Sequence, residues 1–199
     1  TPENTGFTPD PGPLSPGKVM WSYPTSSPIL TSPAVVGDWV YLTTTDGRAL
    51  ALDRHTGQEV WEYATSVPSD TSPAVAGDLV FLGLRDTRFI ALDRETGALR
   101  WQKDLGNPVL ASPIVVDGTV FIGSTNNELY ALDAATGRER WNFSTQGWIV
   151  SPVAYADGVV AVTSQDGLLH SVDVGTGRQH FVYDAGWPIM GGPAIHGDR

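Results

Sequence analysis

The chain has 199 residues, a formal net charge of −10 and no cysteine. The absence of cysteine excludes disulfide bonds, thiolate metal sites and thiol nucleophiles. The 22 acidic residues outnumber the 12 Lys and Arg residues, and no basic cluster occurs, so nucleic acid and anionic membrane surfaces are excluded as partners. No apolar run reaches the length of about 18 residues that a membrane span needs, and we predict no direct membrane insertion.

The first 18 residues are rich in Pro and Gly, as in Pro9-Asp10-Pro11-Gly12-Pro13. This composition favours a stiff, extended tether that has little to bury. We therefore predict a tether over residues 1–18 and a folded part over 19–199. Because the chain starts at Thr1 rather than Met, we interpret it as part of a longer protein or as a processed form.

The motif Asp-x-x-Thr-Gly-x-x-x-Trp occurs three times at intervals of 40 residues, and a fourth copy has Phe in place of Trp. Its Asp, Gly and aromatic positions are Asp53, Gly57 and Trp61; Asp93, Gly97 and Trp101; Asp133, Gly137 and Trp141; and Asp173, Gly177 and Phe181. A period near 40 is typical of a β-propeller, in which each repeat forms one blade. We predict repeats at about 30–70, 71–110, 111–149 and 150–190.

Each repeat is predicted to form four strands. In the first repeat the predicted strands are residues 32–36, 39–44, 48–53 and 58–63. They are separated by turns at Gly37-Asp38, Asp46-Gly47 and Thr56-Gly57, which are residue types that tolerate the backbone angles of tight hairpins. We predict an all-β propeller of four-stranded antiparallel blades, with partial strands at 19–29 and 191–199 and hence an incomplete ring.

The motif has a structural logic. The Asp carboxylate can accept backbone N–H groups in the turn, the Thr can add a local hydrogen bond, and the Gly can take a backbone angle that a side chain forbids. The Trp that follows can cover a neighbouring blade and bury roughly 150–250 Å². We interpret the repeated Asp residues as structural rather than catalytic.

The pattern Ala-x-Asp-x-x-Thr-Gly-x-x-x-Trp resembles the tryptophan-docking motif of the PQQ-like (quinoprotein) β-propeller repeat family, over about residues 19–199. The resemblance implies that Trp61, Trp101 and Trp141 pack between adjacent blades, and that Phe181 makes a smaller contact. If Trp21 is a docking residue, its partner turn is expected to be absent from the chain. Members of the family usually have more than four blades. We therefore expect the ring to be completed by residues missing here or by a second copy in a homodimer.

The loops that lead into the innermost strands are expected to form one mouth of the propeller. They are residues 26–31, 67–71, 106–111, 146–150 and 185–191, and they vary while the rest of each repeat is constant. The candidate ligand-binding residues in them are Asp70, Asn107, Trp148, Trp187 and Met190. Trp148 and Trp187 each follow a Gly, so they are either a flat platform at the mouth or packing residues that plug it.

Dehydrogenases of the resembled family hold PQQ over a Ca²⁺ ion, with Glu, Asn and Asp as oxygen ligands. The mouth loops offer only Asp70 and Asn107, which is too few for such a site. The histidines, His55, His170, His180 and His196, show no ligand spacing. We predict no catalytic residue, metal or cofactor.

The favoured function is therefore a non-catalytic extracytoplasmic propeller, periplasmic or at the cell surface and tethered in its parent protein. It would act as a protein-interaction scaffold or as a ligand-sensing domain, with a protein partner or small ligand at the mouth. A pure scaffold that accepts a partner strand at its sheet edges is a variant of this hypothesis. The alternative is a fragment of a PQQ-dependent dehydrogenase that uses PQQ and Ca²⁺.

Overall fold

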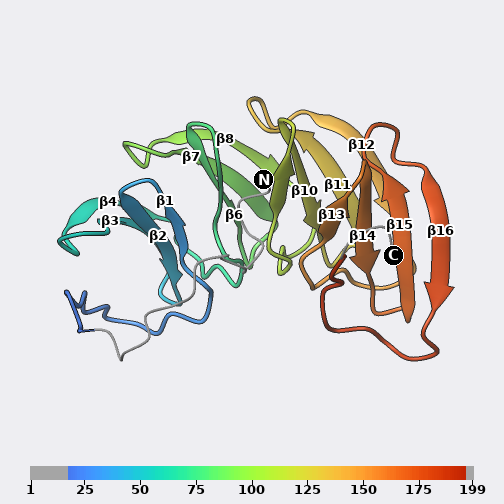
Figure 1. The fold of residues 1–199 in the computed structure, drawn as a ribbon, viewed down its shortest axis with the longest axis horizontal. Helices are drawn as coiled ribbons and strands as arrows, with labels where there is room; N and C mark the ends of the chain where they lie inside the picture. Colours follow the sequence, from blue (N-terminus) through green and yellow to red (C-terminus); the bar gives the residue numbers. More distant parts are fainter. Residues whose placement is uncertain (1–17, 196–199) are drawn as a thin grey trace.

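A computed structural model describes residues 18–195, which form sixteen strands in four antiparallel sheets and no helix (Figure 1). We number these sheets blades 1 to 4 in chain order. Among the described residues there is accordingly no helix of the length and apolarity needed to cross a membrane. The predicted tether, apart from Lys18, and residues 196–199 lie outside the described part of the chain.

In every blade the four strands pair in chain order. Blade 1 comprises β1 (Ala34–Val36), β2 (Trp39–Thr44), β3 (Arg48–Asp53) and β4 (Glu59–Ala64). Blade 2 comprises β5 (Ala74–Ala76), β6 (Leu79–Gly83), β7 (Arg88–Asp93) and β8 (Leu99–Asp104). Blade 3 comprises β9 (Ile114–Val116), β10 (Thr119–Gly123), β11 (Glu128–Asp133) and β12 (Glu139–Ser144). Blade 4 comprises β13 (Ala154–Ala156), β14 (Val159–Thr163), β15 (Leu168–Asp173) and β16 (Gln179–Asp184).

The first strand of blade 1 is shorter than predicted. In blade 1 it begins at Ala34 rather than at residue 32, and it pairs with β2 from Ala34 opposite Tyr41 to Val36 opposite Trp39. Pro33, which precedes it, has no N–H to donate to a strand ladder. The other three strands of blade 1 lie within one residue of the predicted bounds.

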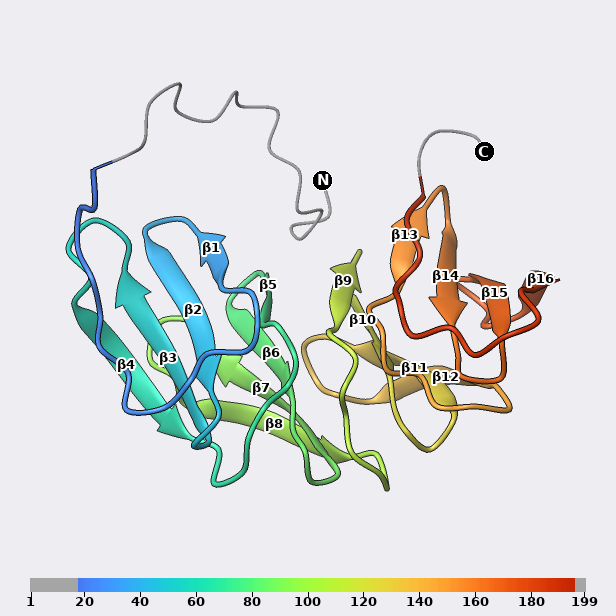
Figure 2. The ribbon, with the colours of Figure 1, turned by 90° about the horizontal axis from the view of Figure 1, so that it is seen from below.

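The blades stand side by side in an open arc, with β4, β8, β12 and β16 on its outer side (Figures 1 and 2). The core lies between blades, because each blade has one apolar face toward its predecessor and one toward its successor. Between blades 1 and 2, for example, Tyr41 and Ala51 pack with Leu82, Ile90 and Leu92, all of them at most 1% exposed. The predicted all-β propeller with an incomplete ring is confirmed.

The Asp and Thr residues of the motif brace the turn between the third and fourth strands. Asp53 Oδ1 accepts the Thr56 amide at 2.8 Å and the Thr56 hydroxyl at 2.9 Å. The same two hydrogen bonds recur at Asp93, Asp133 and Asp173. These bonds satisfy the amide and hydroxyl donors of the turn. They hold the motif glycine, and the carbonyl of the residue after the Asp, in a constant position.

Each motif Trp reaches from the outer strand of one blade to this turn in the next. The Trp61 indole Nε1 donates to the Arg94 carbonyl oxygen at 2.9 Å, and Trp101 and Trp141 donate likewise to Ala134 and Val174 at 2.9 Å. Trp21 donates to the Arg54 carbonyl oxygen at 2.7 Å. The expectation that Trp21 lacks a partner turn is wrong, because the docking crosses from one blade to its successor and the turn of blade 1 is present.

The two ends of the arc differ. Trp21 and Tyr23 pack on Leu42, Leu50 and Leu52 of blade 1. Figure 2 shows the leading segment that carries them running alongside blade 1. On blade 4 no aromatic pair of this kind packs among residues 18–195. Pro193 and Ile195 line a pocket together with Ala161 and Leu169, and Phe181 in β16 is 55% exposed. In the described parts of the predicted end strands, residues 19–29 and 191–195, no strand forms, since neither segment has a sheet partner there.

Candidate functional site

The mouth is built by one backbone hydrogen bond that recurs in every blade. The carbonyls of Pro28, Pro68, Pro108 and Trp148 accept amides of the hairpins β2–β3, β6–β7, β10–β11 and β14–β15 at 3.0–3.2 Å. The entering loops therefore lie at the same end of all four blades as these hairpin turns. This arrangement places the loops that carry all five candidate ligand-binding residues at the same strand ends of the blades, which form the mouth.

Two of the five are engaged by their own blades. Asp70 Oδ2 lies 2.6 Å from Arg85 Nε in blade 2, and this ion pair raises the pKa of Arg85. In blade 3, Asn107 Nδ2 donates to the Thr125 carbonyl oxygen at 3.4 Å. Each side chain thus holds its loop against the neighbouring hairpin, and the structure does not bring Asp70 and Asn107 together with the other three.

The other three gather around the β14–β15 turn of blade 4. The Trp148 carbonyl oxygen accepts the Gln165 amide at 3.0 Å, and Met190 Sδ accepts Gln165 Nε2 at 3.3 Å. The Trp187 backbone lies against Gly167, where an added Cβ would meet the Trp187 oxygen at 3.1 Å. Trp148 is 52%, Trp187 81% and Met190 64% exposed. We call these three side chains the blade-4 mouth surface.

The two Gly-Trp pairs are not equivalent. Trp148 occupies the repeat position of Pro108, whereas Trp187 occupies that of Asn107, one residue earlier. Gly147 approaches the Asp166 amide so closely that no side chain would fit there. The dipeptide is therefore not a repeated element, and its two Trp residues meet at one hairpin from two different loops. At these exposures both indoles present at least half of their surface to solvent.

Sequence reasoning missed a buried pair just beneath this surface. His170 Nε2 lies 3.7 Å from Asp166 Oδ2, and both side chains are less than 10% exposed. The His170 ring also meets Phe143 of blade 3 edge-on, with centroids 5.3 Å apart, and its Nδ1 lies 3.2 Å from Gln179 Oε1. Ile90 and Tyr130 occupy the matching positions in blades 2 and 3, so a polar residue at an apolar repeat position was the available signal.

The Asp166 carboxylate accepts three hydrogen bonds at the mouth. Burial opposes its ionisation, but the Ser164 hydroxyl and the amides of Gln146 and Leu168 donate to it and hold its pKa below the usual value of 3.8. Its hydrogen bond from Gln146 also ties the loop that carries Trp148 to the β14–β15 turn.

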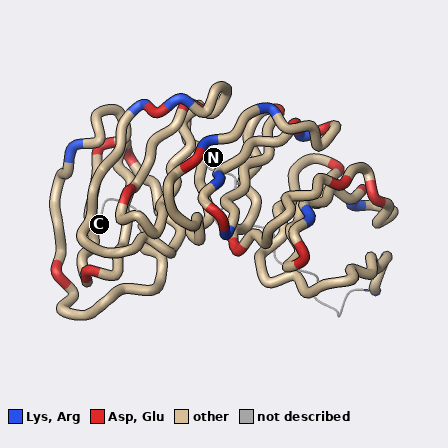
Figure 3. The backbone as a smooth tube through the Cα atoms, turned by 180° about the vertical axis from the view of Figure 1, so that it is seen from behind, with Lys and Arg blue, Asp and Glu red and all other residues tan. Residues whose placement is uncertain are grey.

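The charged residues of the described chain are otherwise interspersed by sign along the turns and outer strands (Figure 3).

The described residues do not fit a calcium-bound quinone. Among residues 18–195 no three Asp, Glu or His side chains come together in a group that could hold a metal ion. Asp70, the one acid among the candidate residues, is already paired with Arg85. We therefore derive no step through such a cofactor.

Sequence comparison places the chain in a family. The family model described as "Outer membrane protein assembly factor BamB" matches residues 14–114 and again residues 90–196. The chain belongs to the BamB family. The resemblance to PQQ-like propeller repeats is thereby confirmed. A search of curated protein sequences found no match to this BamB-family chain.

Solved structures agree with this assignment. BamB from Moraxella catarrhalis is 26% identical with a TM-score of 0.74, over 81% of this chain and 55% of that one. Quinohemoprotein alcohol dehydrogenase from Comamonas testosteroni is 18% identical with a TM-score of 0.72, over 81% of this chain and 35% of that one. The computationally designed Ika4 protein is 18% identical with a TM-score of 0.73, over 80% of this chain and 99% of that one. The last two share the fold alone. This BamB-family chain spans about half of the BamB structure and about a third of the dehydrogenase.

Proposed function

We propose that this BamB-family chain is a non-catalytic propeller module that binds a protein partner through the blade-4 mouth surface. The single observation that carries the proposal is the exposure of Trp148, Trp187 and Met190 around one hairpin. Aromatic residues and Met are enriched at protein–protein interfaces, and large exposed apolar side chains that gather on a monomer surface usually mark a binding site.

The scaffold beneath this surface suits that role. The β14–β15 turn is held by hydrogen bonds to both flanking loops, so the two indoles are presented from a fixed support. Rigid aromatic side chains lose little conformational entropy when a partner covers them. The partner is proposed to be a protein because BamB, whose family this is, is described as an assembly factor.

The proposed location is extracytoplasmic, in the periplasm or at the cell surface. The description of the family as an outer membrane protein assembly factor supports this location. We also propose that residues 1–18 act as a tether in the parent protein.

A site-specific crosslinker tests the proposal directly. A photoreactive phenylalanine derivative at position 187 is expected to give one dominant protein adduct in cells, identified by mass spectrometry. The matched control carries the same group at Leu99, which is 40% exposed on the outer strand of blade 2, and is expected to give no such adduct. Trp148→Ala should reduce the adduct formed from position 187. An equal yield from both positions would contradict the proposal.

The alternative function, a fragment of a PQQ-dependent dehydrogenase, is tested on the same protein. Addition of PQQ and Ca²⁺ should change the visible absorption of a dehydrogenase fragment in a Ca²⁺-dependent way. We expect no such change, and a saturable one would favour the alternative.

A further inference from the structure

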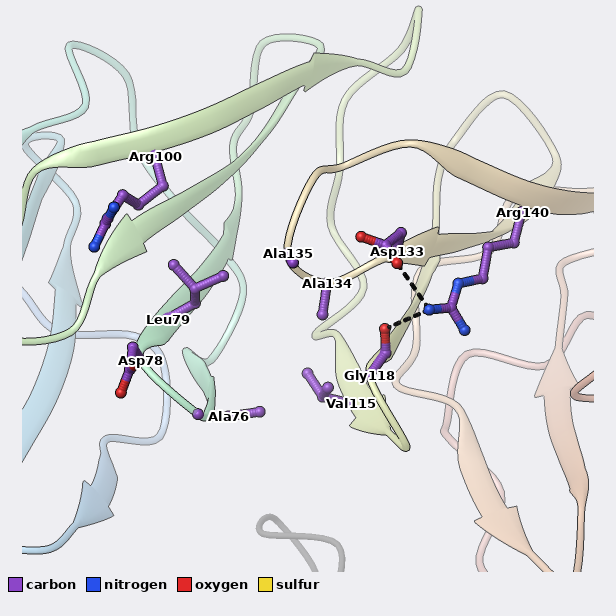
Figure 4. A pocket seen from close by; sticks show the side chains of 11 residues that line it. Ala76, Asp78, Leu79, Arg100, Val115, Gly118, Asp133, Ala134, Ala135 and Arg140 are labelled. Carbon is purple, nitrogen blue, oxygen red and sulfur yellow. Dashed lines mark hydrogen bonds and ion pairs between the residues drawn. The ribbon is translucent and has the colours of Figure 1, made fainter.

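A groove with a volume of about 630 Å³ opens between blades 2 and 3, at the strand ends opposite the mouth (Figure 4). The apolar part of its wall comes from Leu79 of β6, Val115 of β9, and Ala134 and Ala135 in the turn after β11, and the carboxylates of Asp78 and Asp133 also line it. Arg100 of β8 lies at one lip, and Arg140 of β12 at the other (Figure 4). Pockets of this volume, mostly apolar with a few polar groups, are typical of binding sites.

The matching groove between blades 1 and 2 is mostly filled by its own side chains. It has a volume of about 260 Å³ and is lined by Trp39, Arg94 and Glu95. At these three repeat positions the groove between blades 2 and 3 has Leu79, Ala134 and Ala135. An indole, a guanidinium and a carboxylate are thus replaced by an isobutyl group and two methyl groups.

The two blade pairs dock in the same way. The Trp61 indole Nε1 donates from blade 1 to the Arg94 carbonyl oxygen of blade 2 at 2.9 Å, and the Trp101 indole Nε1 donates from blade 2 to the Ala134 carbonyl oxygen of blade 3 at 2.9 Å. The larger volume between blades 2 and 3 therefore comes from side-chain size and not from a shift of the blades. At the repeat position of Leu79 the neighbouring blade pair carries the larger indole of Trp39.

Arg100 gives this groove a second feature that its neighbour lacks. Val60 stands at the matching position on β4. The Arg100 guanidinium donates to Asp93 Oδ2 through Nε at 3.1 Å and Nη2 at 2.7 Å, and its side chain is 56% exposed. The Thr96 hydroxyl and Arg100 together lower the pKa of Asp93 to about 2, so this ion pair persists at neutral pH. A planar cation is thus held at the lip with part of its surface free, and such a group attracts the face of an aromatic ring.

We propose that the groove between blades 2 and 3 binds an aromatic side chain presented by a partner protein. The ring lies against Leu79 and Val115 and meets the Arg100 guanidinium by a cation–π contact. This inference rests on the proposed function and deepens it, because it names the chemistry that a partner brings to the strand ends opposite the mouth. The two surfaces use no residue in common.

Nuclear magnetic resonance with small probes tests the proposal. N-acetyl-tryptophanamide is titrated into the ¹⁵N-labelled chain, with N-acetyl-leucinamide as the matched probe without an aromatic ring. We expect saturable shifts of the Gly118, Ala134 and Ala135 amides with the aromatic probe. The amides of Gly37 and Glu95, in the neighbouring groove, are expected to stay unchanged. Equal shifts with both probes, or none at Ala134 and Ala135, would overturn the proposal.

Variants that install the neighbouring groove's own side chains provide the control. Leu79→Trp combined with Ala134→Arg and Ala135→Glu should abolish the shifts, because these residues already fit the same backbone between blades 1 and 2. If the triple variant does not fold, Ala135→Glu alone, at an exposed turn position, is expected to weaken binding at least fivefold. Arg100→Gln should weaken it about two- to fivefold, the range of an exposed cation–π contact. Unchanged binding in these variants would overturn the assignment.

Failure here and failure of the proposed function are distinguishable. If the aromatic probe does not bind but the crosslink from position 187 forms, this inference is wrong and the mouth surface stands. If the probe binds and no specific crosslink forms, the groove stands and the mouth surface is wrong.

Discussion

The indole of Trp61 lies directly on Gly97 of the next blade, where an added Cβ would sit 2.7 Å from the ring carbon Cδ2. Gly97 also has a φ of 71°, in the left-handed region that favours glycine. The docking of one blade on the next thus depends on the missing side chain of this residue as much as on the indole.

Gly97→Ala is therefore expected to destabilise the chain by about 2–4 kcal/mol, since it adds a steric clash to the backbone strain. Gly77→Ala is the matched control. Gly77 has a φ of 55° but no atom within 4 Å of an added Cβ, so only the strain of about 1 kcal/mol applies. Urea unfolding monitored by circular dichroism measures both. Equal losses would show that the contact with Trp61 contributes nothing.

Trp61→Phe is expected to cost about 1–3 kcal/mol of unfolding free energy. The variant removes the hydrogen bond to the Arg94 carbonyl oxygen and part of the area buried between blades 1 and 2. Phe181→Trp restores the motif in blade 4, where the side chain is 55% exposed, and should change stability by less than about 0.5 kcal/mol. A gain from Phe181→Trp comparable to the loss from Trp61→Phe would contradict this account of docking.

Acid should weaken blade 4 through Asp166. Because the folded pKa of Asp166 lies below its usual value of 3.8, its carboxylate stabilises the fold fully above that value. The contribution is lost as the pH falls through the lowered folded pKa. Asp166→Asn should therefore lower stability at pH 7 and flatten the fall in stability between about pH 5 and pH 2.

The matched control for this acid effect is Asp78→Asn, at an exposed turn position. Because this side chain is exposed, the substitution should leave the stability at pH 7 nearly unchanged. The measurement is the urea midpoint at a series of pH values. A curve for Asp166→Asn that runs parallel to that of the unmodified chain would exclude Asp166 as the cause.

The exposed face of blade 4 tests how the ring is completed. Phe181 and Tyr183 lie on alternate residues of β16 and are 55% and 62% exposed. If a second copy covers this face, light scattering should give twice the mass of one chain, and Phe181→Asp should return the mass to that of a monomer. A stable monomer at all concentrations would contradict the homodimer and favour completion by further residues of the same protein.

The strands could be predicted from the sequence because their ends are marked by turn residues. Asp46-Gly47, for example, ends β2 and starts β3 where the repeat predicts. The direction of docking could not be predicted, since a fixed spacing does not say which of two neighbours a Trp contacts. Trp21 was misjudged for this reason.

The candidate site was predictable only in part. The loops that carry Trp148 and Trp187 were identified, but their meeting at one hairpin depends on how blade 4 holds the loops on either side of it. The groove between blades 2 and 3 was missed, although the replacement of Arg94 and Glu95 by Ala134 and Ala135 is visible when the repeats are aligned. Its volume depends on residues from two blades, and no single repeat carries that information.

The leading segment that places Trp21 on blade 1 gives the arc a polarity. One end is clamped, whereas β16 at the other has every residue exposed to solvent. Partial unfolding should therefore begin at blade 4 and proceed toward blade 1, and amide protons should exchange with deuterium in that order. A partner that binds beside blade 4 would therefore first of all stabilise blade 4 against this local unfolding.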